Sequence, residues 1–145
     1  MLLSARELEL STNNNCKMTK LIIDAARDKI FLMIINNNIN YSITHENTKI
    51  NYEKLSLLIN EFLIKRNLDL KNISQIYVNR GPGSFAGIRN SLSVVKAFYL
   101  VNKIDYYCFS FKDFDEKIDV KYENIPKLCE KLKVEKNLIN PIYLS

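Results

Sequence analysis

The chain has 145 residues, of which 47% are hydrophobic and 26% are charged, and its formal net charge is +5 at pH 7. This length suits one domain with its own core, and the composition is that of a soluble globular protein. No apolar run approaches the roughly 18 residues of a membrane span, so we expect no membrane association. Arg6, Glu7 and Glu9 also interrupt what would have to be the apolar part of a secretory signal.

Cysteine and histidine usage limits the chemistry. Cys16, Cys108 and Cys129 are odd in number and widely spaced, which argues against a disulfide framework or a zinc ribbon and predicts a cytoplasmic protein. His45 is the single histidine. Most zinc and iron sites and most acyl-transfer triads draw on histidine, and His45 alone cannot build a metal site, which needs three or four donors. We therefore expect no metal, no catalytic residue and no cofactor.

In chain order, residues 1–17 read as a poorly ordered extension. Three antiparallel strands follow at 21–23, 30–35 and 39–44. The first two are continuously apolar and the third alternates apolar with polar residues, as a half-exposed strand does. Three asparagines at 36–38 tolerate a positive φ and predict a hairpin turn.

Two helices are predicted at 52–66 and 88–101, separated by a strand around 73–78. Each helix has one apolar face for the sheet and further apolar residues elsewhere on its circumference. A sheet alone cannot cover both faces, so the surplus predicts contact with a second protein. The residues expected to contribute to that interface are Leu57, Ile64, Val94, Phe98 and Val101.

A fifth strand is predicted at 106–109, after which the signals weaken to a possible short strand at 118–120 and a helix at 126–133. The order of strands and helices indicates an α/β fold with a mixed five-stranded sheet flanked by helices. The positive charge is scattered, which favours solvated faces over a nucleic-acid surface, although an RNA-binding module stays open as an alternative.

The glycine-rich segment 81–87 lies between a predicted strand and a predicted helix. Backbone N–H groups in such a turn can bind an anion, and Gly81-x-Gly83-x-x-Ala86 fits a loose dinucleotide pattern. The pattern does not follow the first strand, and no acidic residue ends a strand about 20 residues on, where residues 100–103 lie. A tight turn that lets the helix pack closely on the sheet is the simpler interpretation.

The segment has a more specific resemblance. Its ten residues Arg80-Gly81-Pro82-Gly83-Ser84-Phe85-Ala86-Gly87-Ile88-Arg89 closely resemble the GPGSFTGLR signature of the TsaB (YeaZ) family, in the glycoprotease-like branch of the actin/Hsp70 fold. Residues 21–26, the pair His45-Glu46 and the ending Pro141-Ile142-Tyr143-Leu144 resemble further landmarks of that family. The resemblance covers residues 19–111 well and implies an actin-like, ribonuclease H-like domain.

Three departures put nucleotide binding in doubt. Ala86 stands where the family signature has threonine, and Ala25 stands where a hydroxyl residue commonly follows the first-strand aspartate. By comparison with the family, we expect a largely missing second domain, shrunk to the last part of the chain. Asp24, Gly81 and Gly83 are the only candidates for binding a nucleotide, and Asp24 is as readily explained as a hydrogen-bonded turn residue.

The resemblance implies a non-catalytic subunit that supports TsaD, the enzyme that places threonylcarbamoyl on adenosine 37 of tRNAs reading ANN codons. It implies a heterodimer with TsaD through helices 52–66 and 88–101, association of the ATPase TsaE, indirect contact with tRNA, and a possible homodimer without TsaD. The alternative is a minimal nucleotide-binding phosphotransferase or hydrolase. The expected domains are the extension 1–17, a family-like domain at 18–111 and a vestigial subdomain at 112–145.

Overall fold

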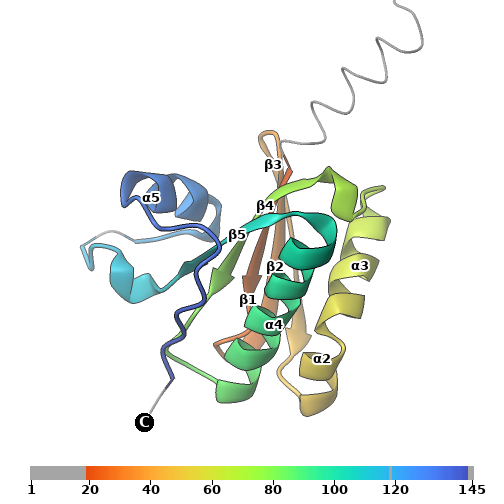
Figure 1. Ribbon diagram of the computed structural model, residues 1–145, viewed down its shortest axis with the longest axis horizontal. Helices are drawn as coiled ribbons and strands as arrows, with labels where there is room; N and C mark the ends of the chain where they lie inside the picture. The colour runs from red at the N-terminus through yellow and green to blue at the C-terminus, as the bar shows by residue number, and fades with distance from the viewer. Residues whose placement is uncertain (1–18, 118, 144–145) are drawn as a thin grey trace, which may run out of the picture.

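A five-stranded mixed sheet organises the chain in the computed structural model, which describes residues 19–117 and 119–143 (Figure 1). The predicted extension 1–17 lies outside these residues. The strands follow the spatial order β3-β2-β1-β4-β5. Their bounds are β1 Thr19–Asp24, β2 Lys29–Asn36, β3 Ile39–Glu46, β4 Ile73–Asn79 and β5 Asp105–Phe109. The predicted fold class is confirmed.

Pairing within the sheet is antiparallel on one side of β1 and parallel on the other. β2 pairs antiparallel with β1 and with β3, whereas β4 pairs parallel with β1 and with β5. Asn37, at φ 57°, turns the chain between β2 and β3, as the asparagine run predicted. β1 and most of β2 are buried because both faces of the sheet are covered there, while the outer strand β3 alternates.

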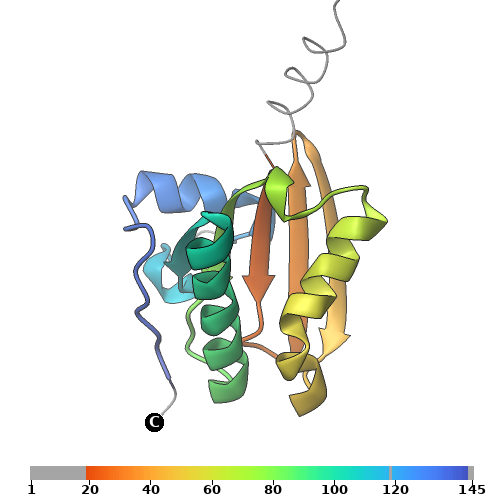
Figure 2. The same ribbon diagram turned by 45° about the vertical axis from the view of Figure 1, so that its right-hand side comes forward.

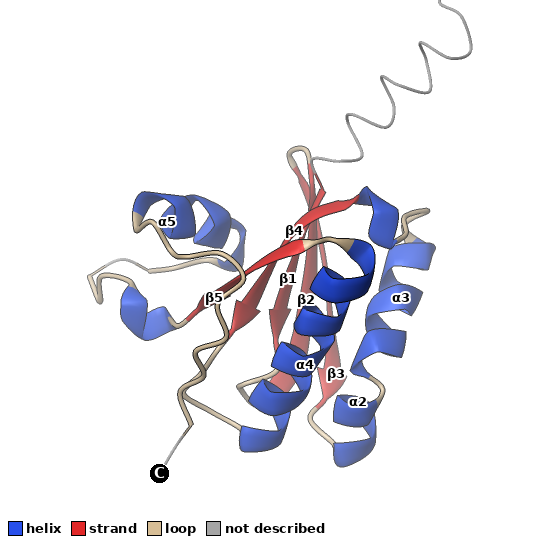
Figure 3. Ribbon diagram, viewed as in Figure 1, coloured by secondary structure: helices blue, strands red, loops and turns tan. Residues whose placement is uncertain are grey.

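Three helices cover one face of the sheet (Figure 3). They are α2 Lys49–Glu53, α3 Leu55–Lys65 and α4 Phe85–Asn102. The single helix predicted at 52–66 is therefore two helices that meet at Lys54, and α2 begins early because the Thr48 side chain accepts a hydrogen bond from the Asn51 N–H. α4 likewise begins three residues before the predicted start, because Ser84 caps it by accepting from the Gly87 N–H.

The main core lies between these helices and the sheet. It combines the helix-facing side chains of the strands with the inner faces of α3 and α4. Its fully buried members are chiefly aliphatic and include Leu21, Ile23, Ile30, Leu32, Ile34, Leu55, Ile59, Leu63, Ile76, Ile88 and Val95. A short 3₁₀ turn, η1 Leu70–Asn72, links α3 to β4.

The opposite face of the sheet is covered by the chain after β5. This segment contains two 3₁₀ turns, η2 Phe111–Asp113 and η3 Tyr122–Asn124, and the helix α5 Ile125–Lys131. The strand predicted at 118–120 is wrong for Asp119 and Val120, which lie in irregular structure, and Ile118 falls outside the described residues. This face holds a smaller, aromatic-rich cluster of Ile22, Met33, Tyr77, Phe109, Phe114, Ile125 and Cys129.

The last described residues return past β5 and run beside α4 towards its N-terminal end (Figure 2). Lys136 forms an isolated antiparallel β-bridge with Tyr107, and the Asn137 N–H donates to the Tyr106 carbonyl at 2.7 Å. This segment therefore covers the outer edge of β5. No helix in the described ranges is long and apolar enough to cross a membrane.

Candidate functional site

The signature loop 80–84 connects β4 to α4. The glycines of this loop and of the first turn of α4 lie where backbone segments nearly touch. Gly81 has φ 109°, and a Cβ there would come 2.0 Å from the Ile142 carbonyl oxygen. A Cβ on Gly83 would lie 2.0 Å from the Ala26 carbonyl oxygen, and one on Gly87 would lie 1.7 Å from that of Ala25. The glycines therefore allow the loop and α4 to pack directly against the end of β1, as the simpler interpretation of the loop predicted.

Several N–H groups of the loop are occupied by the protein itself. The Gly81 N–H donates to the Asn79 side-chain oxygen at 2.9 Å, and the Ser84 N–H donates to the Ala26 carbonyl at 2.8 Å. Further on, the Gly87 N–H donates to the Ser84 hydroxyl at 3.1 Å. An anion at these donors would have to displace existing hydrogen bonds, so the loop is a poor phosphate site in this conformation.

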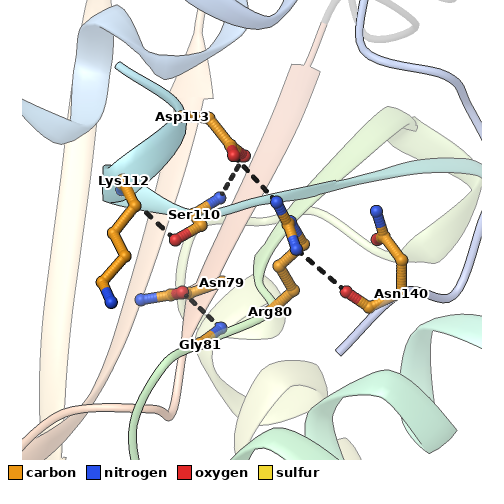
Figure 4. Close-up of polar contacts among 7 residues, drawn as sticks. All are labelled: Asn79, Arg80, Gly81, Ser110, Lys112, Asp113 and Asn140. Atoms are coloured by element: carbon orange, nitrogen blue, oxygen red, sulfur yellow. Dashed lines mark hydrogen bonds and ion pairs between the residues drawn. The ribbon is translucent and has the colours of Figure 1, made fainter. Parts of the chain in front are cut away.

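Arg80 joins the loop to the C-terminal part of the chain (Figure 4). Its guanidinium donates to the Asp113 carboxylate at 2.8 Å and to the Asn140 carbonyl at 3.1 Å. The Asp113 carboxylate also accepts from the Ser110 N–H at 2.9 Å, and the Ile142 N–H donates to the Arg80 carbonyl at 2.7 Å. The signature arginine thus holds both η2 and the final residues against the loop.

Asp24 is fully buried and both of its carboxylate oxygens have partners. One oxygen accepts from the Ala26 N–H at 3.1 Å, and the other accepts from the Tyr122 hydroxyl at 2.6 Å, with the Arg27 guanidinium 3.7 Å away. Burial, followed by the neighbouring Asp24 carboxylate, raises the pKa of Tyr122, so its hydroxyl remains a donor. This geometry favours the turn-aspartate interpretation over a nucleotide ligand.

Neither Tyr122 nor Asp113 was predicted from sequence. Tyr122 lies 98 positions from Asp24, and Asp113 lies 33 positions from Arg80. No local spacing signals contacts of this range, and only the fold brings the pairs together.

Metal-ligating groups do not converge in the described residues. No cluster of three or more histidine, cysteine, aspartate or glutamate side chains suited to a metal ion occurs in residues 19–117 and 119–143. His45 lies on β3 opposite Ile30, and its buried Nε2 atom has no hydrogen-bond partner there.

The five predicted interface residues divide into two groups. Leu57, Ile64 and Val101 are 50%, 67% and 77% exposed on the outer sides of α3 and α4. Val94 is half-buried against the main core, and Phe98 is only 7% exposed within it. The placement of Phe98 on an outward surface is therefore wrong.

The buried stripe of α4 explains this correction. It runs through Ser91, Val95 and Phe98, so that Phe98 points inward while the next residue, Tyr99, is half-buried. Sequence reasoning also missed Ile50 and Leu100, which are 62% and 58% exposed. For Ile50 a signal was available, because it precedes Leu57 by seven residues as Leu57 precedes Ile64, although the break at Lys54 places it on a separate helix.

Comparison with known proteins agrees with this architecture. A family model described as "TsaD: tRNA N6-adenosine threonylcarbamoyltransferase" matches residues 43–110. The "tRNA threonylcarbamoyladenosine biosynthesis protein TsaB" of Buchnera aphidicola subsp. Schizaphis graminum is 27% identical over 90 residues, which are 62% of this chain and 43% of that protein. The TsaB protein of Buchnera aphidicola subsp. Baizongia pistaciae is 35% identical over 68 residues, covering 41% of this chain and 31% of that protein.

A solved structure, YeaZ from Pseudomonas aeruginosa, superposes with a TM-score of 0.59 at 20% identity, over 63% of this chain and 43% of that one. A second structure, of an uncharacterized protein from Pseudomonas aeruginosa described as similar to peptidase YEAZ, matches with the same TM-score, identity and coverage. By these matches the chain is similar to TsaB and YeaZ proteins in sequence and in fold. The chain spans less than half the length of the relatives it matches.

The two alanines that stand where hydroxyl residues were expected lie in different surroundings. Ala25 is fully buried, with its carbonyl against Gly87, so its side chain is part of the main core. Ala86 is exposed in the first turn of α4, where its carbonyl accepts from the Asn90 side chain at 2.8 Å. Neither methyl group can replace the hydrogen bonds of a hydroxyl, which further weakens the case for a nucleotide at this TsaB-like loop.

Proposed function

We propose that this protein is a non-catalytic subunit that supports a TsaD-type enzyme in threonylcarbamoyladenosine modification at position 37 of tRNAs reading ANN codons. Similarity to proteins named for threonylcarbamoyladenosine biosynthesis supports the pathway. The rival activity, a nucleotide-dependent phosphotransferase, has less support because the oxygens of Asp24 and several N–H groups of the loop are already bonded within the chain.

The observation that carries the proposal is the outward apolar surface of α3 and α4. We define the outer helix surface as Leu57, Ile64, Leu100 and Val101, each at least half exposed. Leu57 and Ile64 lie opposite the buried stripe of α3, because that stripe runs through Leu55, Leu58, Ile59, Phe62 and Leu63. The two helices lie side by side on the same face of the sheet (Figure 2), and all four residues of the outer helix surface belong to them.

An interface is the physical reason for such a surface. Large apolar side chains that gather on one side of a domain mark a protein contact more often than scattered ones do. Two adjacent helices offer ridges and grooves into which helices of another protein can pack. We propose the TsaD-type subunit as that protein, with a TsaE-type ATPase joining the pair and tRNA bound through the complex. The location would be the cytoplasm, and a homodimer would form on the same surface when the TsaD-type subunit is absent.

Co-expression with the TsaD-type protein of the same genome tests the proposal. We expect wild-type chains to co-elute in gel filtration, and the double variant Leu57→Asp/Ile64→Asp to elute alone, because it places two carboxylates in an apolar contact. Modified nucleoside in tRNA from cells that depend on this protein should fall in parallel. Leu132→Asp is the matched control, since Leu132 is 47% exposed at the end of α5 on the other side of the sheet.

The double variant should keep the far-ultraviolet circular dichroism and melting temperature of the wild type, because both side chains are already exposed. Co-elution that survives the double substitution, or that is lost equally with Leu132→Asp, would contradict the assignment of the surface. Normal modification of tRNA in cells without the chain would contradict the pathway itself.

A further inference from the structure

A cavity of about 580 Å³ lies between α5 and the sheet, on the face opposite α3 and α4. Its walls come from the starts of β1 and β4, from β5, and from α5 with the residues that follow it. The volume falls in the range of small-molecule sites, roughly 300–1,000 Å³. The cavity is separate from the outer helix surface, and the proposed partner role does not use it.

Two tyrosines supply an aromatic wall. Tyr77 of β4 and Tyr107 of β5 are direct neighbours in the sheet, and their rings stack with centroids 5.1 Å apart and planes 13° apart. The Tyr77 hydroxyl donates to the Gln75 side chain at 2.9 Å, which fixes the ring. Tyr77 is buried and Tyr107 is half-buried, so Tyr107 supplies the accessible ring, which is suited to stacking against a planar heterocycle as aromatic side chains do with nucleobases.

Positive charge surrounds the aromatic wall. Lys20, Lys127 and Lys133 line the cavity, and Glu130 is the one acidic residue that lines it. None of the three lysines takes part in an ion pair within residues 19–117 and 119–143. Ammonium groups without an internal partner, grouped at a concave site, favour a phosphate ligand.

We propose that this cavity binds a nucleoside phosphate, with its base against the ring of Tyr107, which the buried Tyr77 backs, and its phosphate among Lys20, Lys127 and Lys133. The same chemistry is present in a free mononucleotide and in a nucleotide of an RNA strand.

The cavity is a binding site without covalent chemistry. Burial raises the pKa of the Cys129 thiol to about 12, and burial also raises the pKa of Tyr77. Both groups therefore remain protonated near neutral pH, and a protonated thiol is a poor nucleophile. Their role in the cavity is to shape an apolar, neutral wall beside the lysines.

Titration of the ¹⁵N-labelled full chain with adenosine monophosphate, followed by NMR, tests the proposal. We expect saturable shifts confined to the start of β1, to β4 and β5, and to residues 125–134. Binding should be about tenfold weaker for ribose 5-phosphate, which lacks the base, and for adenosine, which lacks the phosphate. Shifts that are absent at millimolar nucleotide, or that spread over the whole surface without saturating, would overturn the site.

Two variants separate the site from nonspecific charge. Lys127→Glu/Lys133→Glu should weaken adenosine monophosphate at least about tenfold, because it reverses two of the cationic groups. The control Lys121→Glu/Lys131→Glu makes the same charge change at exposed positions outside the cavity lining, and should leave affinity within about twofold. Equal weakening by both variants would overturn the proposal.

Tyr107→Leu tests the stacking contact independently of charge. Affinity for adenosine monophosphate should fall towards that for ribose 5-phosphate, while ribose 5-phosphate itself should bind as before. An unchanged preference for the mononucleotide would refute the role of the aromatic wall. If unmodified tRNA displaces adenosine monophosphate, the site binds a nucleotide of an RNA strand. If adenosine monophosphate stays bound in the presence of tRNA, the site binds a free mononucleotide.

Discussion

The two faces of the sheet are closed by different means. On the helix face, α2, α3 and α4 cover a large aliphatic core with regular structure. On the opposite face, a segment of two 3₁₀ turns and the seven-residue helix α5 covers a smaller core rich in aromatic rings. The rings of Phe109, Phe111, Phe114 and Tyr122 contact one another there, and Phe31 stacks on Tyr122 with centroids 4.0 Å apart.

This contrast shows how a short chain can close a sheet on both sides. Regular helices bury an aliphatic stripe and present a second stripe to the outside, where another protein can bind. The opposite segment has little regular structure, and it depends on a few large rings and on side chains that bond across long sequence separations. We therefore expect the helix face to contribute most of the stability and the aromatic face to open first.

The largest effect is expected inside the helix face. Phe98→Ala should cost about 3–5 kcal/mol in the free energy of unfolding, because it empties a buried aromatic site between α4 and the sheet. Leu100→Ala, two residues away and 58% exposed, is the control and should stay within about 0.5 kcal/mol. Urea unfolding measures both, and similar losses for the two variants would mean that α4 is rotated from the position described.

A second test addresses the point where the signature loop supports the helix face. Gly87→Ala should cost about 3 kcal/mol, because the added Cβ would meet the Ala25 carbonyl oxygen at 1.7 Å and force α4 away from β1. The neighbouring Ala86→Thr, which restores the family residue at an exposed position, should cost less than about 1 kcal/mol. Thermal unfolding distinguishes the two, and a tolerated Gly87→Ala would contradict the proposed reason for this glycine.

Sequence patterns predicted the helix face well, since its signals are local. The continuous apolar strands, the asparagine turn and the apolar stripe through Leu55, Leu58, Ile59 and Phe62 are all visible in short windows. The glycines of the loop also had a physical interpretation, close packing, that the distances to Ala25 and Ala26 support.

The opposite face and part of the site could not be predicted in this way. Arg80 and Asp24 are fixed by Asp113 and Tyr122, and no periodicity connects residues so distant in sequence. The inward position of Phe98 was missed because one step of 100° along a helix decides whether a residue faces the sheet or the outside. The cavity beside α5 depends on how an irregular segment lies over the sheet, which composition does not indicate.

A moderate effect is expected where the two faces are linked by Asp24. Tyr122→Phe keeps the ring that stacks on Phe31 but removes the hydroxyl that donates to the Asp24 carboxylate at 2.6 Å. The loss should be about 1.5–2 kcal/mol, since a buried carboxylate would lack one donor. Hydrogen exchange should also quicken in residues 111–117 and 119–134 before it does in α4. Tyr143→Phe, at an exposed tyrosine, is the control. An equal loss of free energy of unfolding in the two variants would show that the contact with Asp24 does not stabilise the fold.

The smallest effect is expected from the two buried thiols, one on each face, through the pH dependence of the free energy of unfolding. Cys108 belongs to the helix-side core and Cys129 to the aromatic one, and burial raises their pKa values from about 9.0 to about 11 and about 12. Each folded thiol holds its proton more tightly than the unfolded one, so this contribution is complete below about pH 9 and is lost as the pH rises towards 11 and 12.

Between pH 7.5 and pH 10 each thiol should therefore account for a loss on the order of 1 kcal/mol in the free energy of unfolding. The free energy of unfolding is measured at both pH values for the wild type and for the variants Cys108→Ala and Cys129→Ala. Its fall between the two pH values should be correspondingly smaller in each variant than in the wild type. A variant whose pH dependence equals that of the wild type would show that its thiol already exchanges with solvent. That result at Cys129 alone would mean that the aromatic face opens under native conditions while the helix face stays closed.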